Sequence, residues 1–131
     1  MAWRNYKSGS KYHSQKVSIA QEIFDSKKEA RRWLELRNME SHGLISGLQR
    51  QKKFLLIPSQ HELDRVGPRG GRIKGKLIER EVAYYADFYY FDEISKKFIV
   101  EDTKSPATRT EAYILKRKMM LLFYGIKIKE V

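Results

Sequence analysis

The chain has 131 residues, of which 41% are hydrophobic, and this suits one domain with a single core. It has no cysteine and no apolar run near the roughly 20 residues that span a bilayer, which excludes disulfides, thiolate metal sites and a membrane span and leads us to expect a cytoplasmic protein. The net charge of +11, from 27 Lys and Arg against 16 Asp and Glu, favours nucleic acid as the partner over an anionic membrane or a merely solubilising role.

Residues 1–21 are polar and basic, and we expect a flexible arm there with a short strand near Val17–Ile19. The first helix is predicted to begin after Ser26, which suits an N-cap, and Glu29 three residues later would complete a capping box. Gly43 would end this helix. Four residues form its predicted apolar face: Ala30, Trp33, Leu34 and Leu36.

Leu48–Pro58 is predicted to be a strand that the proline ends. Residues 59–80 are rich in Gly, Lys and Arg, which indicates a mobile basic loop that buries little. The aromatic run Val82–Phe91 predicts a second strand, and after a turn at residues 92–95 the stretch Phe98–Lys104 would pair with it as an antiparallel hairpin.

Ser105–Ala107 should break the sheet, after which Thr110 can cap a helix through Ala112–Tyr124 that Gly125 stops. Six residues form its predicted apolar face: Tyr113, Ile114, Leu115, Met119, Leu122 and Phe123. The alternation in Ile126–Val131 predicts a terminal strand. The order helix, three strands, helix, strand (αβββαβ) predicts a single α/β domain over residues 22–131, with a mixed central sheet flanked by helices.

Two carboxylates lie in the predicted hairpin. Asp87 interrupts an aromatic strand, where a charge is costly unless it is paired, and Asp102 ends an apolar run. A hairpin can place them side by side, and strand alternation puts Asp102 and Lys104 on one face. Adjacent carboxylates repel, so a divalent cation would compensate them, and oxygen ligands favour Mg²⁺, with Mn²⁺ as a substitute.

Lys104 would complete a site for phosphodiester hydrolysis. Its ammonium group can orient the attacking water and stabilise charge on the phosphoryl oxygens, while the metal lowers the pKa of the water. The alternative is that Asp102 and Lys104 form an ordinary surface ion pair, which would contribute little.

This arrangement resembles the PD-(D/E)XK nuclease superfamily, through Ala86–Asp87 on one strand and Asp102–Lys104 on the next. Ala86 departs from the motif, which has proline there. The chain is also similar to small phage-encoded proteins of unknown function that are related to Holliday junction resolvases. Four stretches carry this similarity: Phe24–Ala30, Leu48–Phe54, Tyr85–Phe88 and Val100–Lys104.

The resemblance implies a restriction-endonuclease-like core and a further acid from the first helix, for which Glu29 is the matching residue and a third metal ligand, unless it serves only as a cap. Gln51 matches a strand glutamine near such sites, although an exposed strand glutamine is equally ordinary. Glu101 adjoins Asp102 as an alternative ligand, but only Asp102 gives the acid-x-Lys spacing.

The function that these features predict is a Mg²⁺-dependent endonuclease, acting on branched or otherwise structured DNA in the host cytoplasm. The alternatives are a non-catalytic nucleic-acid-binding protein and a restriction-type nuclease, for which the chain has little room. Symmetric incision of a junction would need a homodimer. Basic residues of the loop are expected to contact phosphates flanking the scissile bond, together with one lysine of the first strand: Lys52, Arg69, Arg72, Lys74 and Lys76.

Overall fold

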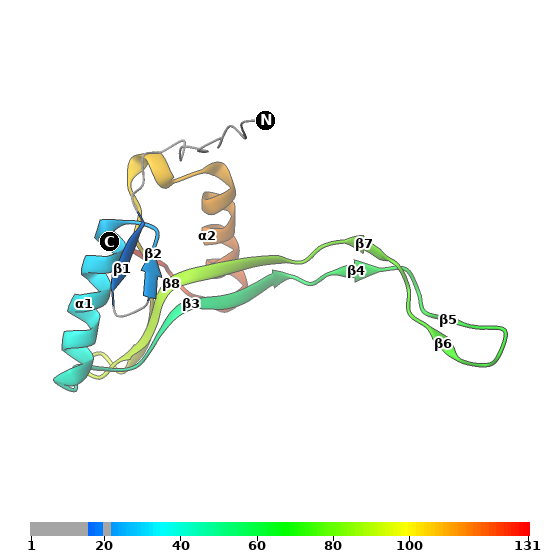
Figure 1. Ribbon diagram of the computed structural model, residues 1–131, viewed down its shortest axis with the longest axis horizontal. Coiled ribbons are helices and arrows are strands. Elements are labelled where there is room, and N and C mark those ends of the chain that lie inside the picture. Colours follow the sequence, from blue (N-terminus) through cyan, green and yellow to red (C-terminus); the bar gives the residue numbers. More distant parts are fainter. Residues whose placement is uncertain (1–15, 20–21) are drawn as a thin grey trace, which may run out of the picture.

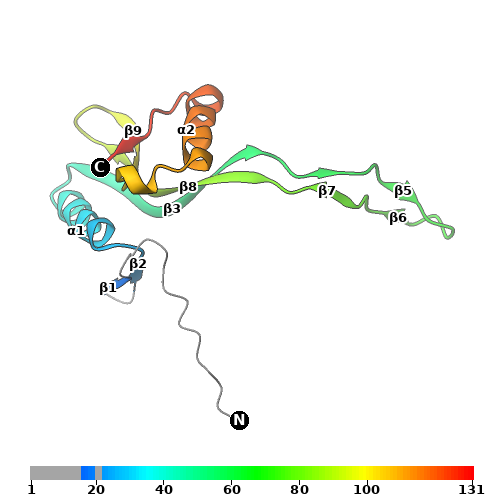
Figure 2. The ribbon, with the colours of Figure 1, turned by 90° about the horizontal axis from the view of Figure 1, so that it is seen from above.

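The computed structural model of the protein describes residues 16–19 and 22–131 and has a mixed α/β fold (Figures 1 and 2). A four-stranded sheet has the strand order β10-β9-β8-β3, in which β10 runs parallel to β9 and the other neighbours are antiparallel. The strands and helices of this central part are α1 (Lys27–Ser41), β3 (Ile45–Ile57), β8 (Val82–Asp92), β9 (Lys97–Asp102), the short 3-10 helix η1 (Pro106–Thr108), α2 (Glu111–Tyr124) and β10 (Lys129–Glu130).

A small antiparallel pair, β1 (Val17–Ile19) and β2 (Glu22–Phe24), precedes α1. The predicted short strand near Val17–Ile19 is therefore confirmed. The expected flexibility of residues 1–21 falls mostly on residues 1–15 and 20–21, which lie outside the described residues.

Helix α1 begins and ends as its sequence predicts. The Ser26 side chain accepts a hydrogen bond from the Glu29 amide, and Gly43 follows the helix with a φ of +74°. Ala30, Trp33 and Leu36 are buried, but Leu34 is 51% exposed, so the predicted apolar face was too wide. The side chain of Glu29 is buried and contacts Arg50, which leaves the predicted capping box half formed.

The largest departure from the predictions is the segment 59–80, which is a paired β arm and not an irregular loop. Strands β3 and β8 continue outward as four short strands, in which β4 (Gln60–His61) pairs with β7 (Leu77–Glu79) and β5 (Arg65–Val66) with β6 (Arg72–Ile73). The arm extends beyond both helices (Figures 1 and 2). Strand pairing satisfies its backbone without a core, and the prediction that it buries little is confirmed.

Helix α2 packs on the β3–β8 ribbon and is capped by Thr110, with Gly125 ending it at a φ of +66°. It buries only Tyr113 and Met120, whereas Leu115, Leu122 and Phe123 are exposed. The predicted apolar face was therefore wrong in three of its residues, because a two-stranded ribbon covers only a narrow stripe of the helix.

Two apolar clusters divide the core between the helices. One lies under α2, around Phe54, Tyr84 and Val100, and the other lies under α1, around Trp33 and Phe88. In the described part of the chain, no helix has the length and apolarity needed to cross a membrane.

Candidate active site

The register of the sheet aligns three polar residues across three strands. Strand β3 pairs with β8 through Arg50–Phe88 and Lys52–Ala86, which places Gln51 opposite Asp87. Strand β8 pairs with β9 through Phe88–Glu101, and this register continues to place Asp87 opposite Asp102. Gln51, Asp87 and Asp102 therefore form one cross-strand row, which we call the acidic row, at the point where β9 ends.

Asp102 is a buried carboxyl group with an incompletely compensated charge. It is 3% exposed, its Oδ2 accepts a hydrogen bond of 2.7 Å from the Tyr84 hydroxyl, and its Oδ1 lies 3.4 Å from Lys104 Nζ. Burial, a hydrogen bond with Asp87 and repulsion from its charge raise the pKa of Asp102 to about 7, despite the lowering effects of Tyr84 and Lys104. The fold thus places two carboxyl groups together without enough positive charge for both.

Asp87 is held from two sides. Its Oδ2 accepts from the Thr103 amide at 2.8 Å and from the Thr103 hydroxyl at 2.7 Å, while its Oδ1 accepts from Gln51 Nε2 at 3.3 Å. Thr103 was not among the predicted site residues, although it is the middle residue of the Asp102–Lys104 motif. Gln51 has a φ of +51°, a left-handed conformation that is rare within a strand and that often accompanies functional sites.

Lys104 lies just beyond β9 and not within it, so the predicted third strand is two residues too long. Its Nζ approaches Asp102 and lies 4.3 Å from the centroid of the Tyr113 ring. An open cleft of about 280 Å³ lies at this point between the sheet and the start of α2. Nine residues line it: Tyr84, Tyr85, Asp87, Asp102, Lys104, Thr110, Ala112, Tyr113 and Lys116.

Glu29 lies near the row but has a partner of its own. The carboxylate is 3.5 Å from Arg50 Nη2, and its pKa is raised by burial and then by the charges of Asp87 and Asp25. Within residues 16–19 and 22–131, no group of three or more His, Cys, Asp and Glu side chains is arranged to hold a metal ion. The structure therefore brings together Asp87 and Asp102 as a candidate pair of ligands and does not add Glu29 to it.

The pair fits a hard divalent cation. Carboxylate oxygens are ligands that Mg²⁺ accepts, and Mg²⁺ commonly binds through one or two carboxylates while it keeps several waters. The open cleft beside Asp87 and Asp102 leaves room for such waters.

Glu101, the alternative ligand, is fully buried on the other side of β9. Arg32 binds both of its carboxylate oxygens, at 2.9 and 2.6 Å, and the Tyr90 hydroxyl donates to it at 2.9 Å. Lys129 Nζ lies 3.5 Å away. These contacts make Glu101 a structural residue that joins β9 to α1, and they leave Asp102 as the acid that faces Asp87.

The residues that were expected to contact DNA lie in two places. Lys52 is on β3, with its Nζ 5.7 Å from the centroid of the Tyr89 ring. The other four, Arg69, Arg72, Lys74 and Lys76, are exposed on the arm, whose strands β5 and β6 lie far from the helices (Figures 1 and 2). The paired strands hold this segment extended, and its contact with DNA stays a prediction.

Comparison with known proteins gives one match. The model of a family described as "Protein of unknown function (DUF1064)" matches residues 9–130. No curated protein and no solved structure matches the chain. The matched stretch includes the acidic row, Lys104 and the whole arm, and the description of the family assigns no activity to them.

Proposed function

Because the chain belongs to the DUF1064 family, whose function is unknown, its activity has to be inferred from the site itself, and we propose that it is a metal-dependent DNA endonuclease. The observation that carries this proposal is the pair Asp87 and Asp102, which is held in one cross-strand row beside Lys104. A carboxyl group with a raised pKa, such as that of Asp102, beside a second acid in a cleft is typical of a functional site, and the net charge of +11 favours a polyanionic substrate.

In this proposal Asp87 and Asp102 hold Mg²⁺, with Mn²⁺ as a substitute. The cation would lower the pKa of an attacking water and neutralise charge on the scissile phosphate. Thr103 and Gln51 fix the Asp87 carboxylate, and Tyr84 fixes that of Asp102 through its hydroxyl. Lys104 Nζ, beside Asp102 Oδ1, is placed to orient the water and to stabilise charge on a phosphoryl oxygen.

The finer fold assignment is part of the same proposal. The chain order α1, β3, β8, β9, α2, β10 and the acid-x-Lys motif at the end of β9 support a restriction-endonuclease-like core of the PD-(D/E)XK type. Glu29 is buried on the first helix, where the charge of Asp87 acts on it, and it would be the third acid of such a core. For Glu29 to reach a metal it would have to leave Arg50.

That last requirement favours a second candidate, a DNA-binding protein that keeps the nuclease fold without catalysis. With Glu29 bound to Arg50, Asp87 and Asp102 are the two acids that line the cleft among the described residues. Against this candidate, a protein that only binds DNA gains nothing from two carboxylates that would face phosphate. We therefore prefer the catalytic candidate to the DNA-binding one, with branched DNA as the substrate and a homodimer as the active form.

One cleavage assay tests both candidates. Four-way junctions, flaps, forks, single strands and linear duplexes are incubated with Mg²⁺, Mn²⁺ or EDTA, and the products are resolved by length. We expect cleavage of branched DNA with either metal, no cleavage in EDTA, and none by Asp87→Asn. Glu35→Gln is a matched control because it removes an exposed carboxylate of α1. DNA binding without cleavage in any metal would favour the second candidate, and full activity of Asp87→Asn would exclude the proposed site.

A further inference from the structure

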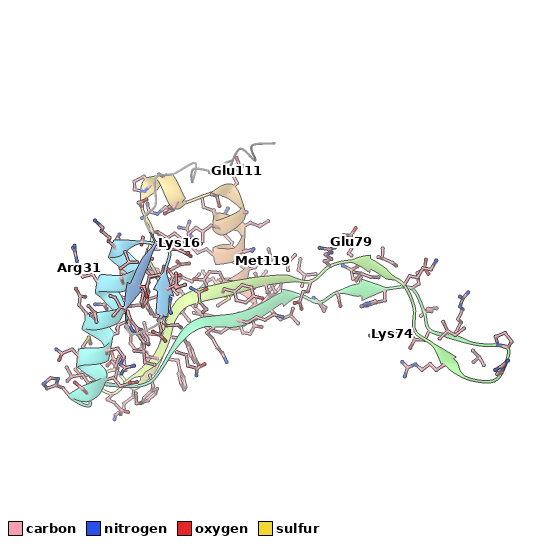
Figure 3. The ribbon with its side chains drawn as sticks, viewed as in Figure 1. Lys16, Arg31, Lys74, Glu79, Glu111 and Met119 are labelled. Atoms are coloured by element: carbon pink, nitrogen blue, oxygen red, sulfur yellow. The ribbon has the colours of Figure 1, made fainter. Side chains whose placement is uncertain are left out.

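The arm separates its charges along its length. Its outer part, residues 65–76, contains no acid and five basic residues: Arg65, Arg69, Arg72, Lys74 and Lys76. The part nearer the sheet, residues 58–64 and 77–81, contains one arginine and four acids: Glu62, Asp64, Glu79 and Glu81. Figure 3 shows Lys74 on the outer part and Glu79 nearer the body. We call these two parts the basic tip and the acidic stem.

Most charges of the basic tip have no internal partner. Arg72 pairs with Asp64, whose carboxylate also accepts from the Gly75 amide at 2.7 Å. In the described part of the chain, no ion pair involves Arg65, Arg69, Lys74 or Lys76. These four side chains are exposed and free to bind an external anion.

The backbone of the tip is narrow and well defined. Gly67 and Gly71 close it through a hydrogen bond of 2.7 Å, and Gly70 takes a φ of +78°. A Cβ on Gly75 would collide with the Glu62 carbonyl, so the two sides of the arm lie close together where the stem meets the tip. A narrow two-stranded ribbon is one of the two shapes that the major groove of DNA admits.

The length of the arm sets a distance between the tip and the acidic row. At about 3.3 Å per residue, the stretch from Gln51 to Gly67 spans roughly 50 Å, or about 15 base pairs at about 3.4 Å each. In the acidic stem between these two points, two acids are held in ion pairs: Asp64 with Arg72 and Glu81 with Lys53. Among the described residues, Glu62 and Glu79 have no ion pair and outnumber the single arginine of the stem, so the stem does not attract phosphates. A duplex bound in the cleft is therefore not expected to continue along the stem.

We propose that the basic tip binds a second duplex segment, separate from the one in the cleft and about 15 base pairs from the scissile phosphate. The inference rests on the proposed function, since it takes the substrate to be DNA. It deepens that function by stating what makes branched DNA suitable: a second helical arm can meet the tip while the first occupies the cleft. The cations would hold phosphates on either side of the groove.

The test measures binding as a function of the length of the junction arms. Asp87→Asn protein is titrated with four-way junctions whose arms are about 8 or about 20 base pairs long. The tip variant adds Arg69→Ala, Arg72→Ala, Lys74→Ala and Lys76→Ala to Asp87→Asn. The control adds four exposed lysines changed to alanine outside the arm, and so removes the same charge: Lys96, Lys97, Lys118 and Lys127.

We expect Asp87→Asn and the control to bind the long-armed junction at least tenfold more tightly than the short-armed one. The tip variant should show no such gain in affinity. The log–log salt slope on the long-armed junction should also fall, by about 0.9 per lost contact and so by up to roughly 3.6 for four contacts. A full length-dependent gain in the tip variant, with its melting temperature unchanged, would overturn the inference.

A shortened arm separates the remaining outcomes. Residues 62–76 are replaced by Asn-Gly, which forms a two-residue hairpin turn between His61 and Leu77. This variant should also lose the length-dependent gain and sediment as the parent does. If it keeps the gain but becomes smaller in sedimentation, the arm binds a second copy of the chain and the inference is wrong. If the wild type binds long-armed junctions through the tip but cleaves no DNA with Mg²⁺ or Mn²⁺, the nuclease proposal fails and the tip inference stands.

Discussion

Two neighbouring acids on opposite faces of β9 differ in how fully their charges are compensated. Glu101 and Asp102 are consecutive and both are buried, at 0% and 3% exposure. On the α1 face, the Glu101 carboxylate accepts hydrogen bonds from Arg32 and Tyr90 and forms an ion pair with Lys129. On the cleft face, the Asp102 carboxylate accepts a hydrogen bond from Tyr84 and pairs with Lys104, but it also faces the carboxylate of Asp87. The pKa of Asp102 is raised to about 7.

Glu101 therefore serves the fold, whereas Asp102 is available to a ligand. A buried carboxylate that loses its only partners is strongly destabilising, so Glu101 and Arg32 depend on each other. Asp102 and Asp87 repel each other in the folded protein, so a proton or a cation that binds them stabilises the fold. A carboxyl pair that the fold leaves uncompensated is suited to binding rather than to stability.

The largest expected effect comes from substituting these neighbours separately. Asp102→Asn should lower the rate of DNA cleavage at least about 1,000-fold, equivalent to about 4 kcal/mol, because it removes a metal ligand. It should not lower the free energy of unfolding, since Asn relieves the repulsion from Asp87. Glu101→Gln should lower the free energy of unfolding by on the order of 3 kcal/mol, because it removes the buried charged partner of Arg32 and leaves it only the exposed Glu35.

Urea unfolding and single-turnover cleavage on the same preparations measure both effects. The folded fraction of Glu101→Gln should cleave at close to the wild-type rate, which makes each variant the control for the other. If Asp102→Asn were as destabilised as Glu101→Gln, Asp102 would be a structural residue, and the contrast between the two faces would disappear.

A smaller effect should appear in the pH dependence of stability. The pKa of Asp102 is raised to about 7 by burial and by Asp87, so the folded protein holds a proton that the unfolded chain releases near pH 4. The stability from this proton is fully present below the unfolded pKa and is lost as pH rises through about 7. Without metal, the free energy of unfolding should fall by up to about 1.4 kcal/mol per pH unit between about pH 5 and pH 7, and should level off above about pH 8.

Denaturant titrations in EDTA from about pH 5 to about pH 8.5 measure this slope. Asp102→Asn should flatten it, and so should Mg²⁺, because the cation replaces the proton between the two carboxylates. An equal slope in wild type and Asp102→Asn would show that other groups cause it. A slope that Mg²⁺ leaves unchanged would indicate that the pair does not bind the cation.

The same contrast shows what the sequence can predict. Strand periodicity and the acid-x-Lys spacing were sufficient to pair Asp87 with Asp102, because these are local patterns on a hairpin. The ion pairs of Glu101 with Arg32 and of Glu29 with Arg50 join residues 69 and 21 positions apart. No local pattern encodes them, so the sequence could not show that Glu29 has a partner of its own.

The arm illustrates a different limit. Its Gly-rich, charged composition predicts exposure correctly, but backbone pairing does not depend on apolar alternation, so the short strands β4 to β7 leave little trace in the sequence. The left-handed conformation of Gln51 was equally hidden, since glutamine rarely adopts it.

The smallest expected effect comes from that residue. Gln51→Gly should relieve the strain at a φ of +51° and change the free energy of unfolding by between zero and about +1 kcal/mol. It also removes the Nε2 donor that lies 3.3 Å from Asp87 Oδ1, so cleavage should fall by up to about tenfold, or about 1.4 kcal/mol. Lys96 in the β8–β9 turn has a similar φ of +57°, and its side chain pairs with the turn residue Glu93, at the other end of the β8–β9 pair from the proposed ligands, so Lys96→Gly is the matched control, with the same gain in stability and unchanged cleavage. Gln51→Ala removes the same donor, so it should lower cleavage by the same factor without gaining stability. If Gln51→Gly kept full activity, the strained glutamine would not position Asp87, and Thr103 alone would hold that carboxylate in the row.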